Sequence, residues 1–128
     1  MGKFTFGKSE RLKKEKLIKE LFNGGSSFYL FPFKVFYLPQ PDPDCAFHQV
    51  LVSVSKRNFK RAVDRNRIKR LTREAYRLQK HTLPEAPRLV IGYVYTHKEI
   101  PLFEELKRRL HKSLERLAHE AVKASKPA

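Results

Sequence analysis

The stretch FHQVLVSVSKRNFKRAVDRNRIKRLTREAYRLQK, residues 47–80, joins two different hydrophobic periods. Its first part, FHQVLVSVS (47–55), carries Val50, Val52 and Val54 at alternate positions, which predicts a strand. From about residue 59 to 80 the apolar residues recur at steps of three and four, which predicts an amphipathic helix. A strand followed directly by a long helix is therefore the centre of the predicted fold.

The chain before this stretch predicts one helix and one extended region. Ser9 has the chemistry of an N-cap, and Asn23-Gly24-Gly25 marks a stop, so we expect a helix from about 10 to 22. The aromatic segment 28–38 predicts extended chain, as two strands or as one merged strand, because Pro32 suits only an edge, a bulge or a strand start. PQPDPD (39–44) predicts a turn. The apolar stripe of the helix is Leu12, Leu17, Ile18, Leu21 and Phe22.

The chain after residue 80 predicts a strand and a last helix. HTLPEAPR (81–88) is typical of a loop, and LVIGYVYT (89–96) is the strongest strand pattern in the chain. Ile100-Pro101 opens the last helix, and KASKPA (123–128) predicts a frayed tail. The helix carries an apolar stripe of Phe103, Leu106, Leu110, Leu114, Leu117 and Ala121.

The predicted order is α-β-β-β-α-β-α within a single domain, 1–128, whose core spans about 9–120. A chain of 128 residues can bury one core, and we find no repeat or linker. Helices and strands mixed at this length favour the α+β class, as a two-layer α/β sandwich with helices covering one sheet face.

The charge balance indicates a polyanionic partner. Twenty-eight Lys and Arg residues against 13 Asp and Glu give a formal net charge of +15 and a pI near 10.2. Nucleic acid is the first candidate for the partner, and an anionic membrane surface is the second. A hydrophobic content of 41% predicts a folded domain, which excludes a disordered basic tail.

Targeting and redox features favour the cytoplasm. No apolar run approaches the roughly 18 residues of a membrane span, and MGKFTFGKSERLKKEK lacks the apolar stretch of a secretory signal. Cys45 is the only cysteine, so an internal disulfide is impossible. We expect a cytoplasmic protein that is not bound to a membrane and needs no protein oligomerisation.

The predicted helix 59–80 separates apolar from basic residues. At about 100° per residue, Ile68, Leu71, Ala75 and Leu78 share an arc of roughly 80° that we expect to face the core. The opposite arc, flanked by Arg65, gathers Asn66, Lys69, Arg70, Arg73 and Arg77.

This basic face is either a solvated helix surface or a phosphate-binding surface. Between Arg57 and Lys80 ten basic residues face only two acids, and Lys69–Arg73 and Arg73–Arg77 are unfavourable like-charge i,i+4 pairs. Arginine, whose planar fork suits phosphate oxygens, outnumbers lysine here. The pattern favours phosphate binding, and periodicity leaves duplex DNA and folded RNA equally open.

Two segments within the stretch resemble the signature of the bacterial ribonuclease P protein subunit family. SVSKR (53–57) precedes AVDRNRIKRLTREAYR (62–77), which contains the family's R-N-R-x-K-R and a following R-E. RLKKEKLIKELFNGGSSF (11–28) is similar to the family's first helix and glycine turn, so the resemblance covers about 9–120. Its specific residues are Arg65, Asn66, Arg67, Lys69, Arg70, Arg73 and Glu74.

The resemblance implies both a fold and an activity. The fold would be ribosomal protein S5 domain 2-like, with a left-handed βαβ crossover. The activity would be that of ribonuclease P, in which protein and catalytic RNA remove the 5′ leader of precursor tRNA. By resemblance, Mg²⁺ and the RNA perform the hydrolysis, so the chain would be an enzyme subunit without a catalytic centre of its own. The residues expected on the catalytic RNA are Arg57, Lys60, Arg61, Arg65, Asn66, Arg67, Lys69, Arg70, Arg73 and Arg77.

The resemblance also implies a cleft between the first helix and the sheet that binds the single-stranded leader. Aromatic faces stack on bases and cations follow the backbone, although Phe22, Phe36 and Ile18 are equally well read as core. Ile18 stands where the family usually has an aromatic residue, and KRNFKRAV (56–63) replaces a shorter glycine-containing turn. The expected cleft residues are Lys13, Ile18, Phe22, Phe36 and Lys56.

Other chemistry finds little support in the sequence. Cys45 and His48 are too few for a zinc site, and the remaining histidines are scattered. No nucleotide-binding or nucleophile motif occurs. The alternatives to ribonuclease P are a non-enzymatic RNA-binding module, such as a ribosomal protein, and a binder of duplex DNA.

Overall fold

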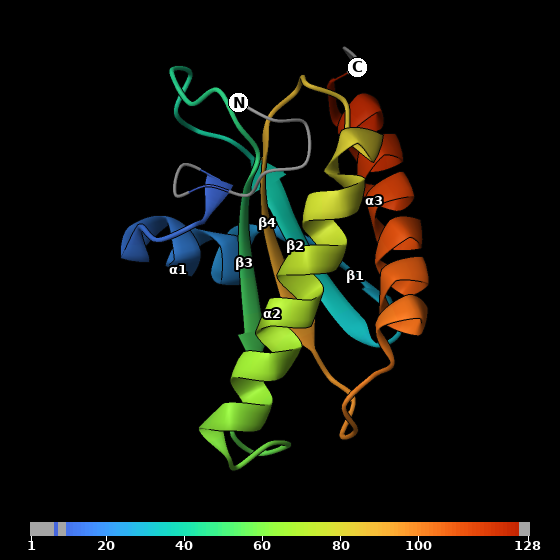
Figure 1. Ribbon diagram of the computed structural model, residues 1–128. Coiled ribbons are helices and arrows are strands. Elements are labelled where there is room, and N and C mark those ends of the chain that lie inside the picture. Colours follow the sequence, from blue (N-terminus) through green and yellow to red (C-terminus); the bar gives the residue numbers. More distant parts are fainter. Residues whose placement is uncertain (1–6, 8–9, 126–128) are drawn as a thin grey trace.

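The computed structural model describes residues 7 and 10–125, apart from the side chains of 122, 124 and 125 (Figure 1). The element order confirms the predicted α-β-β-β-α-β-α, with one short 3-10 helix added after the second helix. The elements are α1 (Glu15–Gly24), β1 (Ser26–Leu30), β2 (Phe33–Pro39), β3 (Gln49–Val54), α2 (Ala62–Gln79), η2 (Lys80–Thr82), β4 (Leu89–Tyr95) and α3 (Phe103–Ser125).

The four strands form one mixed sheet in the order β1-β2-β4-β3. β2 pairs antiparallel with both β1 and β4, whereas β3 and β4 are parallel and joined through α2. In Figure 1, α2 lies in front of the sheet, β3 runs downwards, and β4 lies to its right. The crossover is therefore left-handed, against the strong general preference for right-handed connections and as the family resemblance implied.

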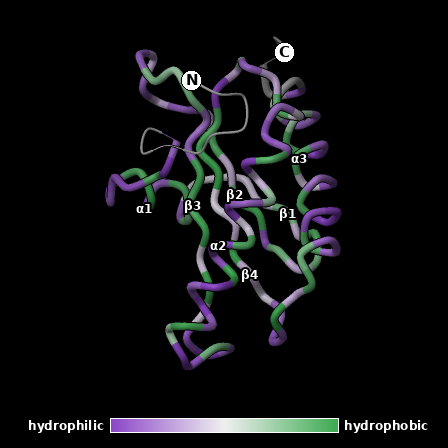
Figure 2. Tube along the Cα trace, in the orientation of Figure 1, coloured by the Kyte–Doolittle hydropathy of each residue, from purple (hydrophilic) through white to green (hydrophobic). Residues whose placement is uncertain are grey.

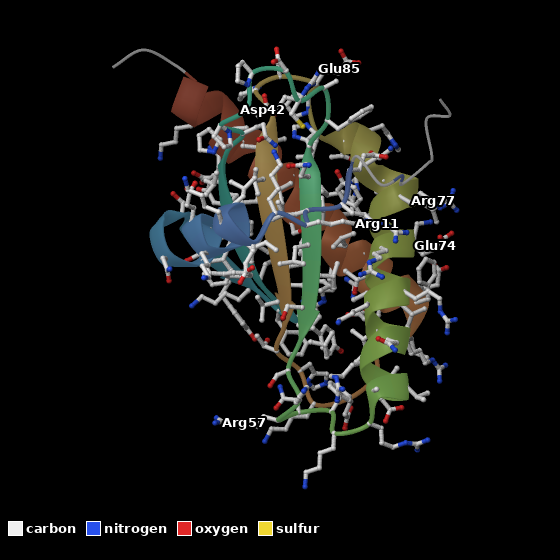
Figure 3. The ribbon with its side chains drawn as sticks, turned by 90° about the vertical axis from the view of Figure 1, so that its left-hand side faces the viewer. Arg11, Asp42, Arg57, Glu74, Arg77 and Glu85 are labelled. Atoms are coloured by element: carbon white, nitrogen blue, oxygen red, sulfur yellow. The ribbon has the colours of Figure 1, made fainter. Side chains whose placement is uncertain are left out.

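Helices cover both faces of the sheet. Figure 3 views the sheet along its edge, with α1 on one side and α2 on the other. The pleat of β4 divides the core accordingly, because successive side chains point to opposite faces. Ile91 and Tyr93 belong to the large cluster under α2 and α3, and Val90 belongs to a smaller cluster with Leu17 and Leu21 of α1. The prediction that helices cover one face is therefore correct for α2 and α3 and wrong for α1, which packs on the other face.

Hydropathy along the chain agrees with this layering. In Figure 2 the hydrophobic colour concentrates on the strands, whereas hydrophilic and hydrophobic segments alternate along α2 and α3.

Tyr93 connects the sheet to α3 through hydrogen bonds, because its hydroxyl lies 2.7 Å from Ser113 Oγ of α3 in the buried core. Ser113 in turn donates to the carbonyl of Leu110. Tyr93 must therefore be the donor in its bond to Ser113.

The first helix begins later than predicted, at Glu15 instead of about residue 10. Residues before it pair with the edge of β3: Arg11 forms a parallel bridge with Val50, and the Leu12 amide donates to the Val50 carbonyl at 3.0 Å. Because these backbone groups are bonded to β3, they cannot form the hydrogen bonds of a helix, and α1 begins after them. Ser9, the predicted N-cap, lies outside the described residues.

The extended region 28–38 forms two strands, as in the predicted element order, and not the merged alternative. β1 and β2 make a hairpin around Phe31 and Pro32, whose peptide bond is cis. The Pro32 carbonyl accepts a bond from the Thr96 amide at 2.9 Å, just beyond β4. Pro32 therefore lies in the turn, where its missing N–H breaks no ladder bond.

The buried face of α2 differs in part from the predicted arc. Ile68 and Ala75 are buried as expected, whereas Leu71 and Leu78 are only half-buried. Thr72 and Tyr76 complete the buried face, because α2 packs against α3 as well as the sheet. The Thr72 hydroxyl donates to the Ile68 carbonyl at 2.8 Å, which satisfies it inside the core. The helix begins at Ala62, because Phe59 enters the core from the preceding loop.

Candidate nucleic-acid interface

The basic residues of α2 line one wall of a groove of about 600 Å³. Arg67 and Arg70 are exposed and Arg73 is half-buried along this wall, whereas the half-buried Lys69 is not one of the residues that line the groove. The opposite wall comes from the segment before α1, which brings Arg11 to the same groove (Figure 3). The full lining is Arg11, Val63, Asn66, Arg67, Arg70, Arg73, Glu74 and Arg77.

Charge in the groove is only partly compensated. Arg77 donates to both carboxylate oxygens of Glu74, at 2.5 and 3.0 Å, and this bond lowers the pKa of Glu74. Burial, and secondly the nearby charge of Arg11, lower the pKa of Arg73. One acid among five arginines leaves the groove strongly cationic, which suits an anionic ligand.

Arg65 has a different environment from the other arginines of the motif. Its Nη1 donates to the Phe59 carbonyl at 2.7 Å and to the Lys60 carbonyl at 2.9 Å. The side chain therefore closes the loop that leads into α2. Arg57, Lys60 and Arg61 are exposed on this loop, beyond the groove, and Figure 3 shows Arg57 on the part of the loop just below β3.

The expected cleft residues of α1 and β2 meet on the other face of the sheet. The rings of Phe22 and Phe36 pack edge to face with centroids 4.9 Å apart, and Ile18 joins the same cluster. All three are half-buried, so they contribute to packing and still expose part of their surface. Lys34 Nζ lies 5.2 Å from the centroid of the Phe36 ring.

Gly92 of β4 makes room for this arrangement. A Cβ at Gly92 would lie 2.9 Å from Leu21 Cδ2 and 3.3 Å from Phe22 Cζ. A side chain at position 92 would therefore displace the ends of the Leu21 and Phe22 side chains, which pack directly over the Gly92 backbone. Lys13 and Lys56, the two cations expected at the cleft, are exposed before α1 and after β3.

His48 is a structural residue. Its Nδ1 accepts a hydrogen bond from the Leu89 amide at 2.9 Å, so the Nε2–H donates to the Pro84 carbonyl at 2.7 Å. Burial, more than any charge nearby, lowers the pKa of His48. Within the described part of the chain, no three His, Cys, Asp or Glu side chains gather closely enough to hold a metal ion. No helix there is long and apolar enough to cross a membrane.

A model of the Ribonuclease P family matches residues 6–120. The chain belongs to this family. It is 41% identical over 121 residues to the ribonuclease P protein component of Porphyromonas gingivalis, covering 89% of this chain and 88% of that protein. It is 37% identical over 118 residues to the one from Chlorobium phaeobacteroides, covering 80% and 81%.

Solved structures share the fold. The ribonuclease P protein of Thermotoga maritima superposes with a TM-score of 0.70 at 23% identity, over 84% of this chain and 96% of that chain. The Staphylococcus aureus protein gives 0.68 at 22% identity, over 85% and 94%. These likenesses agree with the α+β sandwich described above.

Family membership identifies the chain as the protein subunit of ribonuclease P, with an RNA-binding role in tRNA 5′ processing. Family membership thereby favours RNA over duplex DNA as the partner of this protein. Arg11 was missed by the sequence interpretation, which placed residues 10–22 in a helix. The position of Arg11 depends on the backbone pairing with β3, which no local pattern predicts. The sequence signal for a role of Arg11 is only the high density of basic residues in RLKKEK.

Proposed function

We propose that this subunit contacts two RNAs at once, the catalytic RNA through α2 and the 5′ leader of precursor tRNA through the α1 cleft. The carrying observation is that the cationic groove and the Phe22–Phe36 pair lie on opposite faces of one sheet. Because the two surfaces lie on opposite sides of the protein, it can bind both RNAs at the same time without either one displacing the other.

The catalytic RNA binds the exposed cations of α2. Arg67, Arg70 and Arg73 present guanidinium forks that pair with phosphate oxygens and release counterions from the RNA. Neutralised phosphates permit helices of the RNA to approach one another more closely. Arg57, Lys60 and Arg61 extend this contact beyond the groove. Arg65 supports it indirectly, by holding the loop that carries Lys60.

The leader binds in the cleft as a single strand. Its bases stack on the exposed parts of Phe22 and Phe36, with Ile18 as an apolar neighbour, and Lys13 and Lys56 attract its phosphates. Stacking of this kind has little sequence preference, as a subunit acting on many precursor tRNAs requires.

Mg²⁺ acts through the RNA. RNA phosphates are hard oxygen ligands that suit this ion. The protein adds positive charge and holds the leader, and both effects favour substrate and Mg²⁺ binding. We place this activity in the cytoplasm, with one folded domain acting as a single copy.

Reconstitution tests the assignment. The protein is mixed with a bacterial ribonuclease P RNA at low Mg²⁺ concentration, and cleavage of precursor tRNA is measured. We expect clear stimulation over the RNA alone, because added cations offset phosphate repulsion. No stimulation at any protein concentration would contradict the proposed function.

Leader binding is tested separately in the assembled ribonucleoprotein. Precursor tRNA and mature tRNA differ only in the leader, so the ratio of their Kd values isolates its contribution. We expect tighter binding of the precursor. Equal affinities would leave the protein as an RNA-docking module without a leader site.

A further inference from the structure

The segment before α1 is held against the body of the protein at several points. The Leu12 amide donates to the Val50 carbonyl at 3.0 Å, and the Glu10 amide donates to the Gly7 carbonyl at 3.1 Å. Leu12 is itself buried in the small cluster below α1. Residues 10–12 therefore run along the edge of β3 in a defined path.

A buried ion pair ties the same segment to the end of α2. Glu10 is 5% exposed, and its Oε1 lies 2.5 Å from Nζ of Lys80, the first residue after α2. Its Oε2 accepts a bond from the Gly7 amide at 3.1 Å. By contrast, the Lys19–Glu15 pair is 3.8 Å long and both of its side chains are exposed to solvent. Removing one partner of a buried pair leaves an unpaired charge, so the pair fixes the segment relative to α2.

Arg11 lies between these two anchors. Val50 pairs with it on the β3 side, and Glu10 precedes it in the chain. This places its side chain on the groove, facing the α2 wall that carries Asn66, Arg70 and Arg73 (Figure 3). The charge of Arg11 contributes to the lowered pKa of Arg73. Two guanidinium groups brought together across a groove repel each other, and an anion between them relieves that repulsion.

We propose that Arg11 binds a phosphate of the same RNA that docks on Arg70 and Arg73, and that the Glu10–Lys80 ion pair positions Arg11 for this contact. The inference rests on the proposed docking of the catalytic RNA on α2. Arg11, held in place by its buried neighbours Glu10 and Leu12, then forms the second wall of a two-sided phosphate groove. The RNA backbone is held from the helix on one side and from the sheet edge on the other.

Salt dependence tests the role of Arg11. Binding of a bacterial ribonuclease P RNA to the full chain is measured between low and moderate salt for wild type, Arg11→Ala, Arg70→Ala and Lys112→Ala. Each lost phosphate contact flattens the slope of log K against log salt by about one unit. We expect this for Arg11→Ala and Arg70→Ala, and no change for Lys112→Ala, because Lys112 is an exposed α3 residue outside the groove lining.

The comparison with Arg70 separates the two proposals. If Arg70→Ala flattens the slope and Arg11→Ala does not, the second wall is refuted and docking on α2 survives. If neither changes the slope, the docking itself is wrong. Thermal melts of each variant establish that the compared proteins are folded at the binding temperature.

A double-mutant cycle tests the positioning role of Glu10. Glu10→Gln keeps an oxygen for the Gly7 amide but removes the charge that holds Lys80. We expect it to weaken RNA binding in the wild-type background and to add nothing in the Arg11→Ala background, because it acts through Arg11. Lys80→Arg, which keeps the positive charge, should retain near wild-type binding. Additive effects of Glu10→Gln and Arg11→Ala would overturn the positioning role.

Discussion

Phe22 of α1 and Phe36 of β2 meet edge to face, with ring centroids 4.9 Å apart, above the bare backbone of Gly92. Both rings remain half-exposed although they pack against the smaller core cluster. A pair with this geometry can support α1 and still offer aromatic surface to a base. Each ring can therefore serve both packing and base stacking, and substitutions are needed that remove stacking while they preserve packing.

Phe36→Leu should weaken binding of precursor tRNA without unfolding the protein. Leucine keeps most of the apolar volume and loses the aromatic face, whose stacking on a base is worth about 1–3 kcal/mol. We expect the Kd of the reconstituted enzyme for precursor tRNA to rise roughly 5- to 150-fold on that scale, with mature tRNA unaffected. Phe103→Leu is the matched control, because Phe103 is also partly buried and packs against the core cluster on the other face of the sheet. Equal losses for precursor and mature tRNA would argue against leader stacking.

Arg65→Ala and Arg73→Ala should differ in kind. Arg65 donates to two loop carbonyls, and bonds from a charged donor contribute about 1.5–3 kcal/mol. Arg65→Ala should therefore lower the free energy of unfolding by about 1–2 kcal/mol, allowing for its partial exposure. Arg73→Ala should change stability little and flatten the salt dependence of RNA binding by about one unit. Urea melts and binding isotherms measure the two effects. A stable Arg65→Ala variant would mean that the two carbonyl bonds are dispensable.

Stability should fall as the pH drops below about 6.5, the ordinary pKa of histidine. Burial lowers the pKa of His48 in the folded state, so the unfolded chain binds the proton more readily. The stabilisation is complete above the unfolded pKa and is lost as the pH falls towards the folded pKa. Protonation also removes the acceptor for the Leu89 amide.

Urea midpoints between pH 8 and pH 5 measure this dependence. His48→Gln should flatten the profile in that window, at a cost in stability at pH 8. His119→Gln, an exposed position on α3, should keep the wild-type profile. A profile of unchanged steepness in His48→Gln would assign the titration to another group.

Ser113→Ala should destabilise the fold more than Tyr93→Phe. The Tyr93 hydroxyl donates to Ser113 Oγ, while Ser113 donates to the Leu110 carbonyl. Tyr93→Phe removes a donor and leaves Ser113 with its own bond, a loss of about 0.5–1.5 kcal/mol. Ser113→Ala strands a buried tyrosine hydroxyl, which costs about 1–3 kcal/mol. Thermal unfolding of the two variants measures the order, and the reverse order would contradict the donor assignment.

Local patterns determined much of this molecule. The alternation of Val50, Val52 and Val54 specified β3, and the helical period from Ile68 to Ala75 specified which side of α2 is buried. Arg67, Arg70 and their neighbours had to face outwards once that period was set. The R-N-R-x-K-R motif then predicted the family, which the comparisons confirm. These features depend on residues close in sequence, so the sequence alone was enough to predict them.

Tertiary structure decided what distant segments do together. Glu10 meets Lys80 across 70 positions, and this pairing carries Arg11 to the α2 groove. Long-range pairing also explains why α1 begins only at Glu15: the backbone of residues 10–12 is bonded to β3 and is not available for helix formation. No period or local propensity encodes such pairings, since their free energy arises only after the sheet has formed. The basic face of α2 therefore follows from the local sequence, whereas the position of Arg11 across the groove depends on the folded protein.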